Sequence, residues 1–131
     1  LQLQIKTFWH PNIGDGHLNI HVNGQFTSGD LAGECRLAIL FTESQLIGDQ
    51  LYYGNDPEHI TDYQFDHVLR GSVTGAEGLV VIADAAVGDD FQSDYTFNWN
   101  PEWIFENSSI LVVASNENGE VVNCLSHHLA E

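Results

Sequence analysis

Short segments with an apolar period of two residues run through the chain, and they constrain its fold more than any other feature. In residues 1–6, Leu, Leu and Ile alternate with Gln, Gln and Lys, and residues 17–23 alternate in the same way. This alternation is typical of a strand with one buried face, because successive side chains of a strand point to opposite sides. No long segment has the 3.6-residue period of an amphipathic helix. The pattern predicts an all-β protein.

The strongest core signal lies in residues 34–42, ECRLAILFT, which are apolar on both faces. Such a segment is typical of a central strand that another sheet covers. Near the C-terminus, Asn118-Gly119 lies between two apolar runs and predicts a hairpin. We also expect a short helical turn in residues 101–107 and a bulge or strand end at Gly24.

Four further runs, each bounded by turn residues, complete the expected set of strands. They lie at residues 67–72, 79–83, 95–99 and 110–115, and residues 120–125 close the predicted hairpin. Short strands of this number without a long helix predict an immunoglobulin-like β-sandwich of about seven or eight antiparallel strands. We expect a single domain over residues 1–131, which is either a fragment or the mature part of a longer exported protein.

The charge of the chain excludes several classes of partner. Three basic residues stand against 19 acidic ones, which gives a formal net charge of -16. Nucleic acid is not expected as a partner, because a polyanion needs clustered Lys and Arg side chains that release its counterions. Membrane insertion is not expected either, since no apolar run approaches the roughly 18 residues of a span. The acidity favours solubility or the binding of a cation or a basic partner.

One segment carries a resemblance to a known family. Residues 63–75, YQFDHVLRGSVTG, resemble the signature stretch of the twenty-eight-kilodalton outer-membrane-protein-related family of Gram-negative bacteria, in which an aromatic residue precedes a His-Val-Leu-Arg strand. Residues 100–102, 110–116 and 120–123 look like the closing hairpin of that family. The resemblance implies a β-sandwich in an exported envelope or surface protein. It implies no defined biochemical activity.

The residues mark no catalytic constellation. The chain has many carboxylates but no marked pair, and it lacks a nucleophile elbow, a phosphate loop and a complete calcium-hand pattern. We therefore expect a non-catalytic binding or assembly module that binds other envelope or surface proteins. The alternative is a carbohydrate-binding module that stacks sugars on surface aromatics, and an enzyme is the least favoured class. The candidate stacking residues are Trp9, Trp99, Trp103, Tyr52 and Tyr53.

The best candidate for a binding site is the loop over residues 49–62, which lies within a long irregular connection over residues 43–66. A long irregular connection is uncommon in compact domains and often carries function. Its aromatic rings and its carboxylate and amide oxygens suit a sugar, a peptide or calcium. It alternatively covers a sheet edge with its tyrosines packed beneath it. The candidate binding residues are Asp49, Tyr52, Tyr53, Asp56, Glu58, His59 and Asp62.

Calcium is the candidate ligand ion, and we expect no other cofactor. It would bind through residues 49–62 or through a second acidic loop with Asp84, Asp89, Asp90 and Asp94. The pair His17 and His21 is too far apart on a strand to share one ion, so we expect both to face solvent. For Arg70 we expect a structural ion pair or a contact with a carbonyl group.

The two cysteines, Cys35 and Cys124, are a candidate disulfide. Cys35 has the parity of the core-facing residues of its strand, and Cys124 lies in the strand that closes the core. We expect both to be buried. In an oxidising compartment they would pair, provided that their Cα atoms lie within about 7 Å, whereas in a reducing one they would remain free thiols.

Overall fold

The computed structural model describes residues 1–27, 33–51 and 59–130, and within them ten strands and one short 3₁₀ helix form. The strands are β1 (Gln2–His10), β2 (His17–Gln25), β3 (Cys35–Glu43), β4 (Leu46–Leu51), β5 (His59–Phe65), β6 (Val68–Ser72), β7 (Leu79–Ile82), β8 (Asp90–Asn98), β9 (Ser108–Ser115) and β10 (Val121–His128). Every strand that the sequence predicted is present, and β4 and β5 are additional.

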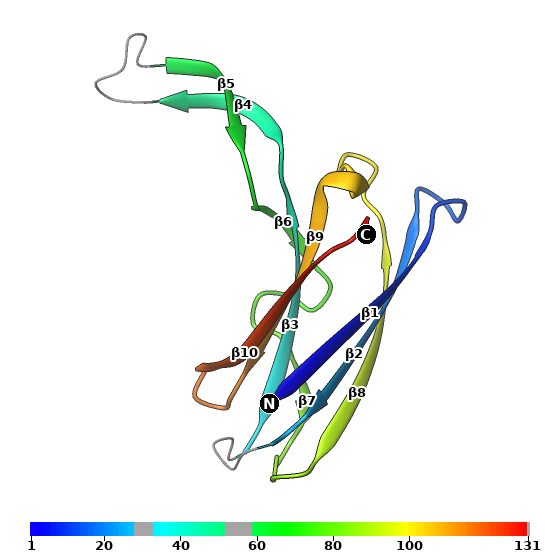
Figure 1. The fold of residues 1–131 in the computed structure, drawn as a ribbon, viewed down its shortest axis with the longest axis vertical. Helices are drawn as coiled ribbons and strands as arrows, with labels where there is room; N and C mark the ends of the chain where they lie inside the picture. Colours follow the sequence, from blue (N-terminus) through cyan, green and yellow to red (C-terminus); the bar gives the residue numbers. More distant parts are fainter. Residues whose placement is uncertain (28–32, 52–58, 131) are drawn as a thin grey trace.

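Two sheets face each other, and a separate hairpin extends from them (Figure 1). The first sheet has the order β1-β2-β8, and the second has the order β10-β9-β3-β6 with β7 also paired to β3. All the pairings are antiparallel. At one side β10 lies against β1, where the Asn123 amide donates to the Leu1 carbonyl at 2.7 Å. The prediction of an all-β antiparallel sandwich is confirmed.

The core lies between the inward faces of β2, β3 and β9. On β2, Leu18, Ile20 and Val22 are fully buried, and the polar residues between them point outward. The inward residues of β3 are likewise buried, which confirms residues 34–42 as the core strand. Each fully buried Leu or Ile contributes about 1.5–3 kcal/mol relative to an exposed one. Because the strands alternate, this burial also determines which side chains face outward.

Aromatic rings fill the end of the core near the connection from β8 to β9. Trp9 stacks on Phe105 with 4.0 Å between ring centroids, and Trp103 stacks on Phe97 at 5.7 Å. Trp99 is buried between them, and its indole N–H donates to the Trp103 carbonyl at 2.9 Å. Of the helical turn expected over residues 101–107, only the last three residues form a 3₁₀ helix.

One ion pair lies inside the sandwich at the end of β3. Glu43 is 1% exposed, and its Oε1 lies 3.4 Å from Nε of Arg70 on β6. A buried carboxylate needs such a partner, because removing a lone charge from water costs several kcal/mol or more. The expectation that Arg70 forms a structural ion pair is confirmed.

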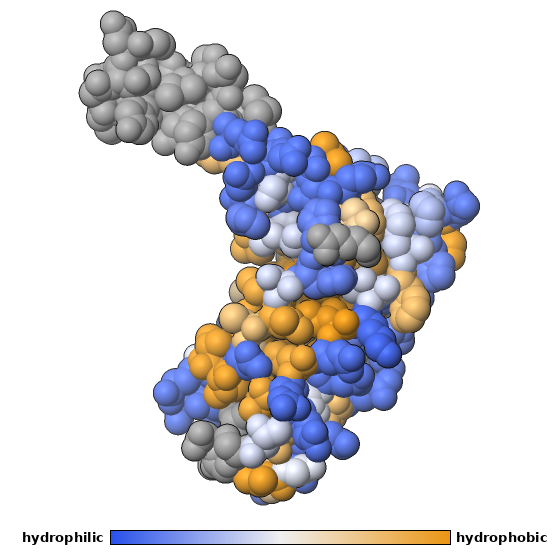
Figure 2. Space-filling view, viewed as in Figure 1, coloured by the Kyte–Doolittle hydropathy of each residue, from blue (hydrophilic) through white to orange (hydrophobic). Residues whose placement is uncertain are grey.

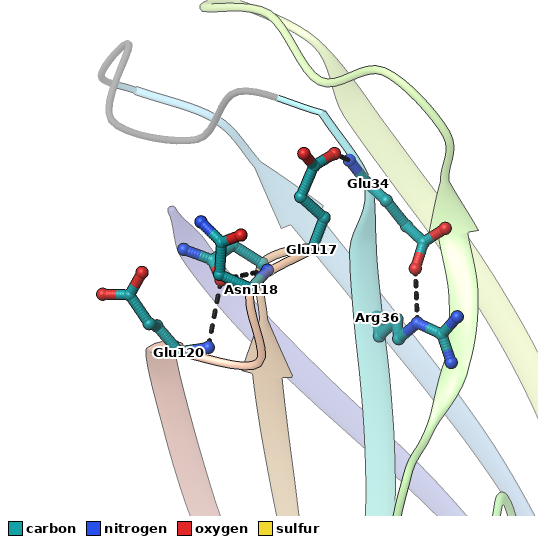
Figure 3. Close-up of polar contacts among 6 residues, drawn as sticks. Glu34, Arg36, Glu117, Asn118 and Glu120 are labelled. Carbon is teal, nitrogen blue, oxygen red and sulfur yellow. Dashed lines mark hydrogen bonds and ion pairs between the residues drawn. The ribbon is translucent and has the colours of Figure 1, made fainter.

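Two local predictions have different outcomes. The turn between β9 and β10 is the expected hairpin, in which Oδ1 of Asn116 accepts the backbone N–H groups of Asn118 and Glu120 at 3.0 Å each (Figure 3). No bulge forms at Gly24, because Gly24 lies in the regular pairing of β2 with β1 and β8, but β2 ends one residue later at Gln25, as the strand-end alternative predicts. A Cβ atom there would lie 2.3 Å from the Phe91 ring, which explains the glycine.

The turn between β6 and β7 offers a matched test of backbone constraint. Gly75 and Gly78 both have positive φ, 82° and 78°, but only at Gly78 would a Cβ atom collide, at 2.6 Å from the Leu37 carbonyl oxygen. We expect Gly75→Ala to cost about 1–2 kcal/mol for the left-handed backbone, and Gly78→Ala to cost roughly 2–4 kcal/mol because steric overlap adds to this. Urea unfolding monitored by circular dichroism measures both. Equal losses for the two variants would contradict the packing around Gly78.

Candidate functional site

The outward side of the first sheet is a surface that we call the polar face. Because directly paired residues of neighbouring strands project to the same side, the register aligns its side chains in five rows of three across β1, β2 and β8. From one end of the sheet to the other, the rows are Gln2, Gln25 and Asp90; Gln4, Asn23 and Gln92; Lys6, His21 and Asp94; Phe8, Asn19 and Thr96; and His10, His17 and Asn98.

Hydrogen bonds between strands link the side chains of the last three rows. His21 Nδ1 lies 2.5 Å from Asp94 Oδ1, and His17 Nδ1 lies 3.1 Å from the side-chain oxygen of Asn98. The Asn19 amide donates to His10 Nε2 at 3.2 Å. The hydrogen bond with His21 is the main cause that lowers the pKa of the Asp94 carboxyl below its usual value. These contacts orient the imidazole and amide groups.

Phe8 is the aromatic residue of the polar face. Its ring is 51% exposed and lies edge-on to the His21 ring, with 5.5 Å between centroids.

The first two rows line a hollow of about 590 Å³. Its lining comprises Gln2, Leu3, Gln4, Asn23, Gly24, Gln25, Asp90, Phe91 and Gln92. Four of the chain's seven glutamines are therefore in this hollow. In the part of the chain that the structure describes, the side-chain amides of Gln2, Gln4, Asn23 and Gln25 have no hydrogen-bond partner within the protein. These amides remain available for a ligand.

The outward side of the second sheet is a surface that we call the apolar face. Its apolar members are Ala38, Leu40, Val80, Leu111, Val113, Val121 and Cys124, and the register of β3, β7, β9 and β10 places Arg36, Thr42, Ser109, Ser115 and Ser126 on the same side. Val121 is 63% exposed and Val80 is 46% exposed. A groove of about 420 Å³ crosses this side between Ala38, Val113 and Val121. In Figure 2, apolar side chains gather near the middle of the molecule, over β3 and β10.

The predicted binding connection is not an irregular loop throughout. Its residues 46–51 and 59–65 form β4 and β5, which pair as a hairpin that projects away from the sandwich (Figure 1). Asp49 lies in β4, and His59 and Asp62 lie in β5. The other candidate residues, Tyr52, Tyr53, Asp56 and Glu58, lie outside the described residues.

The base of the hairpin is held by two reciprocal hydrogen bonds. The backbone N–H of Gln45 donates to Asp66 Oδ1, and the backbone N–H of His67 donates to Ser44 Oγ, each at 3.0 Å. Gln45 and His67 both have positive φ, 62° and 55°, a conformation that non-glycine residues seldom adopt. The two strands therefore leave the sandwich through a locally defined junction.

The two cysteines are free thiols, and the structure confirms the expected burial of Cys35 but not that of Cys124. Cys35 is fully buried on the inward side of β3, whereas Cys124 is exposed. Cys124 pairs with Val113, whose side chain points outward, so the two thiols lie on opposite sides of the second sheet. This geometry does not permit the candidate disulfide. Burial raises the pKa of the Cys35 thiol.

Among the described residues, the tryptophans do not form the expected stacking platform. Trp9, Trp99 and Trp103 pack on one another and on phenylalanine rings instead of forming an exposed surface. Tyr52 and Tyr53 lie outside the described residues.

The acidic residues of the second candidate loop separate in the structure. Asp89 accepts the Ala86 N–H at 2.9 Å within a turn, while Asp90 and Asp94 stand on the polar face. Within residues 1–27, 33–51 and 59–130, no three His, Cys, Asp or Glu side chains are grouped to hold a metal ion.

Comparison with known proteins shows the fold. No protein-family model matches the chain, and no curated protein matches it. Among solved structures, the chain is similar to the crystal structure of a domain of the outer membrane lipoprotein Omp28 from Porphyromonas gingivalis, with a TM-score of 0.52 and 17% identity over 97% of this chain and 87% of that chain. In the described segments, no helix has the length and apolar character needed to cross a membrane.

The junction of the hairpin predicts a pH dependence. The Gln45 N–H, and then the Gln64 amide, lower the pKa of Asp66 below its ordinary value of 3.8. A lowered folded pKa contributes stability above the unfolded pKa, and this contribution is lost as the pH falls through the folded pKa. We expect Asp66→Asn, which keeps the acceptor oxygen, to reduce the loss of unfolding free energy below pH 3.8. Urea titrations at several pH values measure this, with Glu102→Gln as the control. An unchanged slope in Asp66→Asn would contradict the assignment.

The placement of the thiols predicts their reactivity. Under native conditions we expect one thiol to react with a chromogenic disulfide reagent, because Cys124 is exposed and Cys35 is buried with a raised pKa. In denaturant without reductant, both should react. Cys124→Ser should abolish the native reaction, and Cys35→Ser should leave it unchanged. If no thiol reacted in denaturant without reductant, the two cysteines would instead form a disulfide.

Proposed function

We propose that this domain is a non-catalytic assembly module of an exported bacterial envelope or surface protein. The fold shared with a domain of an outer membrane lipoprotein supports this setting. The His-Val-Leu-Arg strand, residues 67–70, supports a relationship to Omp28-type domains. The apolar face is the observation that carries the proposal, because it is a surface suited to another protein.

The exposed apolar side chains of the apolar face suggest a binding surface. Soluble monomers seldom expose large contiguous apolar patches, and those that they have are often binding sites. Here Val80 and Val121 stand at the two ends of one row, with Arg36 and Ser115 between them. The apolar surface continues in the next two rows, in the pairs of Ala38 with Val113 and Leu40 with Leu111. Inward packing does not require these side chains, since the core-facing residues alternate with them. Contact with a partner would remove their apolar surface from water.

The charges at the rim of the apolar face define the partner further. The end formed by the β9–β10 turn carries the carboxylates of Glu117 and Glu120, and beside it Glu34 pairs with Arg36 and donates its backbone N–H to Glu117 (Figure 3). Two copies of a chain with a net charge of -16 would repel each other across such a rim. The partner that fits is a different protein, with an apolar centre and a basic border.

Cys124 provides a test, because it stands on the apolar face beside Val113. A thiol-coupled photo-crosslinker at Cys124 should give one discrete adduct in native envelope extract, identified by mass spectrometry as a protein with a basic border. Adding Val121→Ser should reduce the adduct by about tenfold, since it removes an exposed apolar contact. The control is a double variant in which Cys124→Ser removes the thiol from the apolar face and Thr96→Cys places a thiol on the polar face. Equal adducts from both positions, or adducts only between copies of this chain, would refute the proposal.

A further inference from the structure

The polar face carries the unpartnered amides of the hollow, the exposed Phe8 ring and an ordered set of polar side chains between them. We infer from these features that the polar face binds a neutral oligosaccharide of about three sugar residues. This site lies on the side of the sandwich opposite to the apolar face, so it is independent of the proposed protein contact.

The chemistry of the hollow matches sugar hydroxyls. Each Gln or Asn side chain carries an acceptor oxygen and a donor NH₂ group. An amide can therefore bind two neighbouring hydroxyl groups, giving a hydrogen bond to one and accepting from the other. Gln4, Asn23 and Gln92 form one row of such groups, and Gln2 and Gln25 extend it. Gln92 makes only a long contact of 3.5 Å with Asp94, and the other four have no protein partner in the described chain.

The sheet sets the spacing of these groups. Neighbouring strands lie about 4.8 Å apart, and successive outward residues lie about 6.8 Å apart along a strand. Two rows across three strands thus cover about 10 Å by 7 Å, which is the area of one or two sugar rings. The regular pairing of β1, β2 and β8 holds the row in place without a loop. A preorganised site loses less conformational entropy when it binds.

Phe8 extends the site beyond the hollow. It lies four residues after Gln4 on the same strand, which corresponds to about 13 Å. Its exposed ring offers an apolar surface to the C–H face of a sugar, and the edge contact with His21 holds it. Between the hollow and Phe8 stand Lys6 and the pair of His21 with Asp94. A single sugar does not reach from the amides to the ring, so the expected ligand is an oligosaccharide.

Charge selects a neutral ligand over an acidic one. Asp90 lies at the edge of the hollow, and the whole chain carries a net charge of -16. Lys6 is the one Lys or Arg among the fifteen residues of the polar face. Uronic or sialic acids would meet net repulsion here. Amide groups bind neutral hydroxyls without the cost of removing a charge from water.

The test uses defined trisaccharides. Maltotriose, cellotriose, mannotriose and chitotriose represent neutral ligands, trigalacturonic acid represents an acidic one, and isothermal titration calorimetry measures each with the full chain. We expect at least one neutral trisaccharide to bind with a Kd in the micromolar to millimolar range, and the acidic one to bind at least about tenfold more weakly. Failure of all four neutral probes, or preference for the acidic probe, would overturn the inference.

Matched variants locate the binding. Gln4→Ala and Asn23→Ala should each weaken binding of the best trisaccharide by about tenfold, the effect of one lost hydrogen bond. Phe8→Ala should weaken the trisaccharide while leaving the corresponding monosaccharide unaffected. Ser126→Ala, on the outward side of the second sheet and away from the polar face, is the control. All four positions point outward, so unchanged thermal unfolding verifies folding. Full affinity in both Gln4→Ala and Asn23→Ala would refute this location even if a sugar binds.

Discussion

The pairing of β3 on both edges is the constraint on which the rest of the structure depends. This strand bonds to β9 along one edge and to β6 and β7 along the other, while its inward residues lie fully inside the core. A strand in this position has no tolerance for a slip of one residue, because a slip would turn Leu37 and Ile39 to the outside. The ion pair of buried Glu43 with partly exposed Arg70 adds a polar contact between β3 and β6 in the observed register.

The same alternation produces the two outward surfaces. On the first sheet the residues between the core positions are mostly amides, imidazoles and carboxylates, and on the second sheet aliphatic residues such as Leu40, Leu111 and Val113 stand among Arg36, serines and a threonine. The polar side chains need no protein partner because water solvates them, but the aliphatic ones gain nothing from water. Two sides with such different chemistry suit two different ligands on one small domain. In both cases a sheet, and not a loop, positions the groups.

The sequence was sufficient for the core strands and insufficient for the surfaces. Period-two alternation marked β2 and β3, because burial acts on each strand separately. It did not reveal β4 and β5, where Gly48, Gly54 and Pro57 suggested an irregular connection. The side of Cys124 depends on the irregular pairing between Val121 and Asn123, which no local pattern reveals. The rows of the polar face join strands that are far apart in the sequence; His21 and Asp94, for example, are 73 residues apart. Only the fold brings such residues together.

The aromatic cluster has a consequence for spectroscopy. All three tryptophans belong to it, with ring centroids 5.7 Å apart for Trp9 and Trp99 and 5.5 Å apart for Trp99 and Trp103. Indoles this close exchange excitation energy and couple their electronic transitions, so their emission and near-ultraviolet dichroism report one shared environment. The intrinsic fluorescence therefore monitors the end of the sandwich where β1 meets the β8–β9 connection. An optical signal from this chain is a local reporter of that closure, whereas backbone dichroism averages over both sheets.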